Sequence, residues 1–186
     1  MEALEILGDA QRLFLEGDYE ASVNKFADAL EAGADAFMVF LSRGVAYLRL
    51  EQMDQAIEEF GKAIEKNPDN LRGYYYRGVI FLSKEDFKRA LPDLNRVIAL
   101  DPEHGPAHLA RGTLYGLIGE DEKSAADMKT AIIKSESEMQ GFSDTLGLLR
   151  TQFHRAMAQM TGESEGAALS LTEDEIDQVK KWVDEG

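Results

Sequence analysis

Two histidines have a spacing that could do chemistry. His104 and His108 are four residues apart, the separation at which two imidazoles on one helix face can bind a metal ion. Gly105 and Pro106 lie between them, and a helix that begins near Pro106 would leave His104 outside it. No third ligand is apparent, so we expect both histidines to be structural and the chain to bind no metal.

Three arginines, Arg43, Arg77 and Arg111, are spaced 34 residues apart. Such a ladder of cations could hold an acidic segment of a partner. The alternative is that each arginine stem packs along a neighbouring helix while its guanidinium meets a nearby carboxylate. We favour this second interpretation.

No pattern typical of catalysis is apparent in the sequence. It has no nucleophile paired with a base and no glycine-rich phosphate loop. With 35 acidic residues, neighbours such as Glu58 and Glu59 are expected on a solvated helix face. The chain has no cysteine, which excludes thiolate metal sites and cysteine nucleophiles. We therefore expect a protein that is not an enzyme and has no cofactor.

The net charge of −15 is concentrated at the two ends of the chain. Residues 1–35 hold nine acidic and two basic side chains, and residues 161–186 hold eight and two. This excess would repel phosphate backbones, so we expect no nucleic-acid partner. No apolar run is long enough to span a membrane and no secretory signal is readable, so we expect a cytoplasmic protein without membrane insertion.

A period of 34 residues organises the elements that position these side chains. Small residues recur at Ala10, Gly44, Gly78 and Gly112. An aromatic or apolar column keeps the same spacing: Ile6, Phe40, Tyr74, His108 and Phe142. Within each unit, apolar residues at three- and four-residue steps predict a helix, a short polar break and a second helix. Each unit is therefore predicted to be a helix hairpin that must stack on its neighbours to bury its apolar face.

These columns resemble the tetratricopeptide repeat (TPR) family. The residues that carry the resemblance are Gly44, Tyr47, Ala56, Phe60, Ala63 and Pro68 in one unit and Gly78, Phe81, Ala90, Val97 and Pro102 in the next. Two units match less closely, through Ser22, Phe26 and Ala29 and through Ser124, Met128 and Ala131. The resemblance covers roughly residues 3–136. Pro92 departs from it and should kink or bulge its helix.

We predict an all-α fold, a right-handed α-solenoid of stacked TPR-like helix hairpins with a C-terminal capping helix and an extra terminal helix. The array spans residues 1–160. It comprises four repeats at about 3–36, 37–70, 71–104 and 105–138 and a capping helix at 142–160. A linker follows at 161–171, and then an amphipathic C-terminal helix at 172–186, which begins with a capping box at Thr172 and Glu175.

The resemblance implies that one face of each first helix lines a concave groove for partner segments. The groove residues are Leu7, Gln11, Leu41, Val45, Leu48, Tyr75, Val79, Leu82, Leu109 and Thr113, with Met38, Arg49 and Arg72 on the edges. Family members that hold acidic chaperone C-termini place Lys, Asn and Arg in this groove. Here the set is apolar, so that carboxylate clamp is absent. We expect most of the binding energy to come from Tyr75, Leu41, Val45 and Val79.

We therefore predict a protein-interaction module, an adaptor, assembly factor or chaperone, that binds an apolar peptide or helix. One alternative is a self-assembling scaffold, a homo-oligomer formed by exchange of the terminal helix. Another is a resemblance to the TPR chaperones of secretion systems. The terminal helix presents Ile176, Val179, Trp182 and Val183, and a helix this short needs a surface to pack on. We predict that it docks on the repeats, in cis or on a neighbouring chain, and competes with partners.

Overall fold

The computed structural model describes residues 2–134. They form eight α-helices and no strand, which confirms the all-α fold of helix hairpins. The helices are α1 (Glu2–Glu16), α2 (Tyr19–Glu31), α3 (Ala36–Arg49), α4 (Met53–Lys66), α5 (Leu71–Ser83), α6 (Phe87–Leu100), α7 (Gly105–Leu117) and α8 (Asp121–Lys134). The predicted capping helix 142–160, linker 161–171 and terminal helix 172–186 lie outside the described residues.

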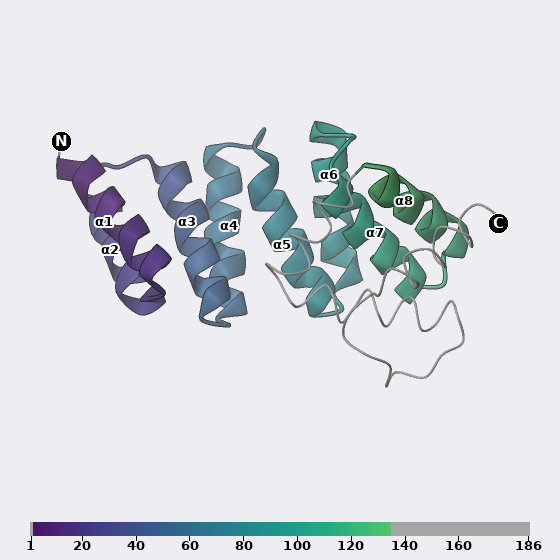
Figure 1. The fold of residues 1–186 in the computed structure, drawn as a ribbon, viewed down its shortest axis with the longest axis horizontal. Helices are drawn as coiled ribbons and strands as arrows, with labels where there is room; N and C mark the ends of the chain where they lie inside the picture. Colours follow the sequence, from purple (N-terminus) through teal and green to yellow (C-terminus); the bar gives the residue numbers. More distant parts are fainter. Residues whose placement is uncertain (1, 135–186) are drawn as a thin grey trace. The chain divides into compact units, whose positions relative to one another are not determined.

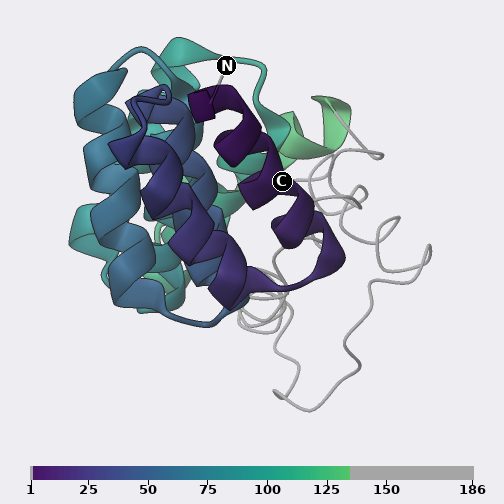
Figure 2. The same ribbon diagram turned by 90° about the vertical axis from the view of Figure 1, so that its left-hand side faces the viewer.

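The chain divides into two compact units, residues 1–80 and 81–186, with the division inside α5. In the first unit α1 packs on α2 and α3 packs on α4, each pair as an antiparallel hairpin, and α2 contacts α3 (Figures 1 and 2). In the described part of the second unit α7 packs on α8 and α6 contacts α7. Within each unit, successive helices therefore bury each other's apolar faces, as repeat proteins require.

Close helix crossings explain the column of small residues. A Cβ atom on Gly44 of α3 would lie 2.6 Å from the Cε1 atom of Phe60 on α4. A Cβ atom on Gly112 of α7 would lie 3.2 Å from the Cγ atom of Met128 on α8. Ala10, the equivalent residue of α1, is completely buried. In the α3–α4 and α7–α8 hairpins a large side chain of the second helix therefore lies against a small residue of the first.

The turns between the two helices of each hairpin share one backbone conformation. Four residues spaced 34 apart have a positive φ: Gly17 (86°), Glu51 (60°), Glu85 (58°) and Gly119 (78°). In each turn the next amide donates to the carbonyl five residues earlier, as Gln52 N does to Tyr47 O at 2.9 Å. This is the Schellman end of a helix, which favours glycine at the left-handed position. Two of the four turns place a glutamate there instead.

The second helix of the third repeat continues through its proline. α6 runs from Phe87 to Leu100 without a break, although Pro92 lies inside it. Proline removes one backbone donor from the helix, so one intrahelical hydrogen bond is lost at this position. Asp86 stabilises the start of the helix, because its Oδ1 atom accepts a hydrogen bond from Arg89 N at 3.1 Å.

Candidate functional site

The predicted partner-binding residues of the first repeats lie on one face of α1 and α3. In α3, Leu41 is buried, and Val45 and Leu48 are partly buried against the core cluster that contains Phe60. In α1, the equivalent stripe begins with Leu7, which is half-buried, and continues with Gln11, which is exposed. α1 also contacts α3. We call the surface made by these stripes the α1–α3 face: Leu4, Leu7, Gln11 and Leu15 of α1 with Met38, Leu41, Val45, Leu48 and Arg49 of α3.

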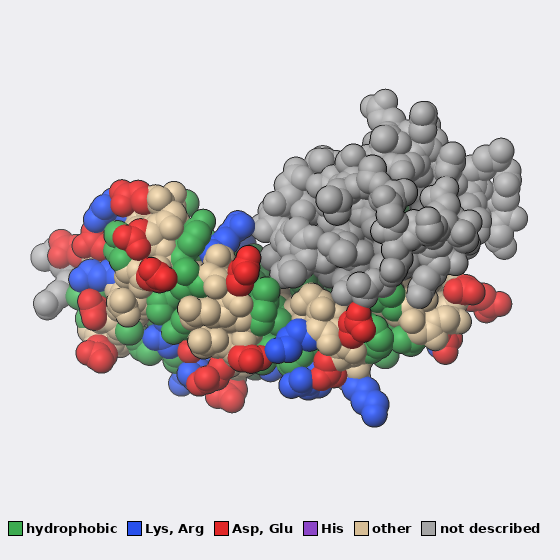
Figure 3. Space-filling view, turned by 90° about the horizontal axis from the view of Figure 1, so that it is seen from below, with side chains coloured by type: hydrophobic (Ala, Val, Ile, Leu, Met, Phe, Trp, Pro, Cys, Tyr) green, Lys and Arg blue, Asp and Glu red, His purple; other side chains and the backbone are tan. Residues whose placement is uncertain are grey.

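Three large hydrophobic side chains of the α1–α3 face are exposed. Leu15 is 83% exposed, Leu4 is 72% exposed and Met38 is 39% exposed. Among the residues that the structure describes, one other large hydrophobic side chain is exposed, that of Ile118 after α7. Figure 3 shows hydrophobic side chains at the surface of the N-terminal end, interspersed with charged ones. The exposed apolar surface is therefore concentrated on α1 and α3.

Leu4 and Leu15 were not included in the groove predicted from the sequence. The 34-residue period could have identified them, since Leu4 occupies the column of Met38 and Arg72, and Leu15 occupies the column of Arg49. Both columns flank the predicted groove. The two leucines extend its apolar edges to the first helix.

The predicted binding residues of α5 and α7 are buried. The exposed fraction is 8% for Tyr75, 1% for Val79 and 0% for Leu82 in α5, and 9% for Leu109 and 1% for Thr113 in α7. Burial raises the pKa of the Tyr75 hydroxyl well above its ordinary value. The Thr113 hydroxyl donates to the carbonyl oxygen of Leu109 at 2.9 Å. These five side chains therefore expose far less apolar surface than Leu4, Leu15 and Met38 do.

The two arginines that the sequence analysis placed at the groove edges are exposed in the first unit. Arg49 lies in the last turn of α3, and Arg72 lies at the start of α5. They occupy the two edge columns, one near each end of the first helix of a repeat. The charged edges are therefore basic, although residues 1–35 are strongly acidic.

The column of Arg43 and Arg111 is structural, as the sequence favoured. Arg43 Nε donates to Glu59 Oε2 across the α3–α4 hairpin at 2.6 Å, and Glu59 is 4% exposed. Lys62 Nζ contacts the other oxygen of the same carboxylate at 3.0 Å. The guanidinium of Arg77 lies against α4, 3.6 Å from the position a Cβ atom would take on Gly61. The arginine column thus ties helices together within the array.

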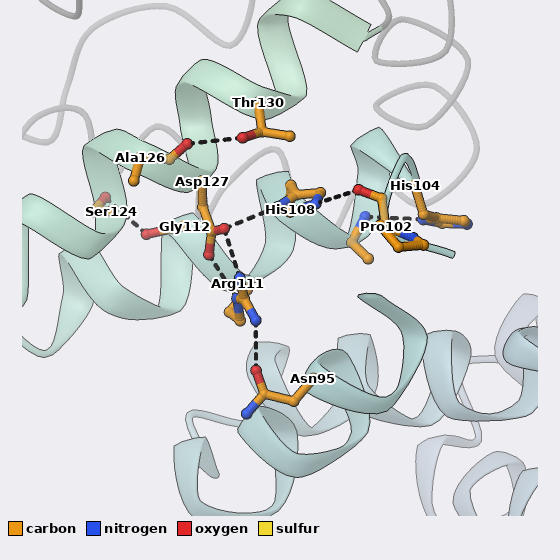
Figure 4. A network of polar contacts seen from close by, with 11 residues as sticks. Asn95, Pro102, His104, His108, Arg111, Gly112, Ser124, Ala126, Asp127 and Thr130 are labelled. Atoms are coloured by element: carbon orange, nitrogen blue, oxygen red, sulfur yellow. Dashed lines mark hydrogen bonds and ion pairs between the residues drawn. The ribbon is translucent and has the colours of Figure 1, made fainter. Parts of the chain in front are cut away.

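In the last described hairpin Arg111 and His108 both contact one buried carboxylate, that of Asp127 (Figure 4). Asp127 of α8 accepts from Arg111 Nε at 2.7 Å and from Arg111 Nη2 at 2.8 Å. Hydrogen bonding to this carboxylate raises the pKa of Arg111. Arg111 Nη1 also donates to Asn95 Oδ1 of α6 at 2.7 Å. The network links α6, α7 and α8 within the second unit.

His108 belongs to the same network, which explains its place in the aromatic column. It is 7% exposed, with Nδ1 2.9 Å from Asp127 Oδ1 and Nε2 3.0 Å from the carbonyl oxygen of Pro102. His104 precedes α7 as its N-cap, and its Nδ1 accepts from Ala107 N at 3.1 Å. The two histidines therefore have separate structural roles.

Within residues 2–134, no group of three or more His, Cys, Asp or Glu side chains is arranged to hold a metal ion. None of the described helices combines the length and the apolar character that crossing a membrane requires.

Comparison with known proteins bears on this arrangement. A family model described as tetratricopeptide repeat matches residues 7–70 and, in an overlapping register, residues 41–105. Among curated proteins, none matches the sequence.

Solved structures with the same fold have low sequence identity to this chain. A structure of the MamA protein has a TM-score of 0.69 at 20% identity, covering 98% of this chain and 90% of its own. YrrB, a TPR protein with an unusual peptide-binding site, has a TM-score of 0.67 at 18% identity, covering 96% of this chain and 85% of its own. The first TPR of Spaghetti (RPAP3), bound to the HSP90 peptide SRMEEVD, has a TM-score of 0.58 at 21% identity, covering 63% and 93%.

Proposed function

Because the chain belongs to the tetratricopeptide repeat family, we propose that it is a protein-interaction module that binds an apolar segment of another protein. Its role would be that of an adaptor, assembly factor or chaperone. The family model covers residues 7–105, which include the whole α1–α3 face beyond Leu4. The proposal locates binding on that face.

The exposed side chains of Leu4, Leu15 and Met38 carry this proposal. Exposed apolar residues scattered singly need no explanation, but three of the four exposed large hydrophobic side chains in the described residues belong to the α1–α3 face, and we refer to these three together as the patch. Covering a leucine or methionine side chain contributes about 1.5–3 kcal/mol. Burial of this patch against a partner would therefore supply a substantial part of a binding free energy.

The chemistry of the face favours an apolar partner. Two of the similar structures concern peptide binding: YrrB has an unusual peptide-binding site, and the first TPR of Spaghetti (RPAP3) is bound to the acidic HSP90 peptide SRMEEVD. Here the corresponding stripe holds Leu7, Gln11 and Val45, which offer no cation to a carboxylate. A helix with an apolar face, or an extended apolar peptide, fits such a surface. Arg49, the basic residue of the face, would orient an acidic residue that flanks the apolar segment.

Affinity capture with surface variants tests the proposal. The bait is the full chain carrying Leu15→Glu and Met38→Glu, two substitutions at exposed sites that leave the core intact. We expect Leu15→Glu to weaken the binding of a partner about tenfold, since it loses about 1.4 kcal/mol or more of apolar burial. The effect of Met38→Glu should be smaller, because Met38 is only 39% exposed before a partner binds. Quantitative mass spectrometry compares captured proteins with those of the unmodified chain.

The matched control is Ile118→Glu, which introduces the same charge at an exposed hydrophobic residue outside the α1–α3 face. It should keep the captured proteins. The proposal fails if the double variant retains every partner at the level of the control. Circular dichroism of all variants confirms that the helices are unchanged.

A further inference from the structure

The exposed stripe of α1 has an order of residues that lets it pair with a second copy of itself. We propose that two copies of this protein associate through their α1 helices, which pack antiparallel. The contact involves α1 alone, within the first unit. It does not rest on the proposed function, although Leu4 and Leu15 belong to the α1–α3 face as well.

The residues of this stripe have the spacing of a coiled-coil seam. Leu4 and Leu15 are 72% and 83% exposed. Two further exposed residues between them complete steps of four, three and four residues, the order in which a and d positions alternate. At 100° per residue, the four positions lie within about 60° of one another around the helix axis. We call them the α1 seam: Leu4, Gly8, Gln11 and Leu15.

The α1 seam is complementary to itself when reversed. If two α1 helices pack antiparallel with their centres aligned, Leu4 of each copy meets Leu15 of the other, and Gly8 meets Gln11. One surface therefore serves both copies, as a two-fold contact requires. A Cβ atom on Gly8 would have no atom within 4 Å, so there is space beside it for the longer Gln11 side chain of the second copy.

The charges that border the α1 seam favour the antiparallel arrangement. Glu5 and Arg12 are exposed and lie on the same side of the seam, one in each half. In an antiparallel pair, Glu5 of each copy lies opposite Arg12 of the other, so opposite charges meet twice. In a parallel pair the two residues would instead face the other border of the seam, which Leu7 and Phe14 form.

The acidic excess of α1 lies away from the seam. The helix has four acidic side chains and one basic side chain. Three of the acidic residues, Glu2, Asp9 and Glu16, lie more than about 100° around the helix from the centre of the seam. Asp9 and Glu16 each contact Arg12 at 3.2 Å. A guanidinium has five N–H donors, so Arg12 can also donate to Glu5 of the second copy. At the seam border itself the charges therefore balance.

Sedimentation equilibrium of the full chain measures this association. We expect the mass to rise with concentration from 20.7 kDa, the mass of one chain, to twice that value. Leu15→Glu changes two symmetric contacts at once, so it should raise the dissociation constant about a hundredfold, tenfold for each contact. Ile118→Glu introduces the same charge at an exposed hydrophobic residue outside α1 and should keep the association.

Two single charge reversals test the antiparallel pairing. Glu5→Arg places two arginines opposite each other, and Arg12→Glu places two glutamates opposite each other. Each variant alone should associate at least about tenfold more weakly than the unmodified chain. An equimolar mixture of the two should regain the association, because every arginine at the seam border then faces a glutamate. Circular dichroism checks that each variant keeps its helices.

Three results would overturn the proposal. The first is a full chain that remains monomeric at millimolar concentration. The second is an association that Leu15→Glu leaves unchanged, which would place the contact on another surface. The third is a mixture of the two charge reversals that associates no better than either variant alone.

Met38→Glu separates this proposal from the proposed function, because Met38 lies on α3 and outside the α1 seam. If the full chain is monomeric but Met38→Glu weakens partner capture, the binding function stands and self-association is rejected. If the mixed reversals associate but Met38→Glu and Leu15→Glu capture as much partner as Ile118→Glu does, self-association stands and the binding function is rejected. If both stand, a partner must displace the second copy, so Glu5→Arg should capture more partner than the unmodified chain.

Discussion

Arg111 and Asp127 form a two-point ion pair between α7 and α8, with Nε 2.7 Å from Oδ2 and Nη2 2.8 Å from Oδ1. The equivalent residues two repeats earlier, Arg43 and Glu59, are also paired across their hairpin, at 2.6 Å. The 34-residue column of arginines therefore has a matching column of acidic residues on the second helices. In both hairpins the pair lies next to the small residue at the helix crossing and fixes one helix against the other.

Removing one partner of this pair should destabilise the second unit. Asp127→Asn keeps the shape of the side chain but leaves Arg111 and His108 without their shared carboxylate. Breaking a buried pair costs about 3–5 kcal/mol, and the partial exposure of Arg111 favours the lower end of that range. Urea unfolding followed by circular dichroism measures the loss, and hydrogen exchange should increase most in α7 and α8.

The control is Asp28→Asn, which breaks an exposed ion pair with Lys25 in α2. Exposed pairs contribute about 0–1 kcal/mol, so little change is expected. Equal effects of the two substitutions would mean that Asp127 is not a structural link between the helices.

The close crossing at Gly44 makes a second prediction. In Gly44→Ala the new methyl group would lie 2.6 Å from a ring carbon of Phe60, so the ring or the helices must shift. Overpacking of this kind costs about 1–3 kcal/mol, more than the helix propensity that alanine adds. Gly8→Ala, on α1, has no atom within 4 Å of the new methyl group and should stabilise the protein by up to about 1 kcal/mol. Thermal unfolding of the two variants should therefore shift in opposite directions.

The turns predict a stabilising substitution. Glu51 has a φ of 60° at a position where Gly17 and Gly119 occur in other repeats. Glu51→Gly should relieve the left-handed strain. Part of that gain is offset by the greater freedom of glycine in the unfolded chain, so we expect the free energy of unfolding to rise by about 0.5–1 kcal/mol. The reverse change, Gly17→Ala, should destabilise through φ alone, since no atom lies within 4 Å of the added methyl group. A loss of stability in Glu51→Gly would contradict this account of the turn.

The repeat period was sufficient to predict the helices and their pairing, because every helix has an equivalent 34 residues away and each needs its neighbour for burial. The period alone did not indicate what joins the helices. Ser22 and Ser124 are weak matches to the repeat pattern, yet their hydroxyls donate to the carbonyl oxygens of Ala10 and Gly112 at 3.0 and 2.8 Å. The carbonyl group that such a hydroxyl reaches on the neighbouring helix depends on how the two helices pack. The pattern of residues in the sequence does not specify that packing.

The proposed binding surface was only partly predictable. The stripe that includes Leu41 and Val45 follows from the period, but burial decides how much of each side chain remains for a partner. Leu41, Tyr75 and Val79 are almost fully buried, whereas Leu15 is exposed. The role of Arg43, in contrast, could be predicted from the sequence. Glu59, the carboxylate with which it pairs, lies sixteen residues later in the chain.

Site-specific photo-cross-linking from Met38 tests the central claim, that partners bind on the α1–α3 face. Benzoylphenylalanine replaces Met38 in the full chain, and replaces Ile118 in a matched control, before irradiation in an extract of the source cells. The account predicts a defined set of adducts from position 38, with the attached peptides mapping to apolar segments, and no such adducts from position 118. Equal adduct patterns from the two positions, or none from position 38, would contradict it.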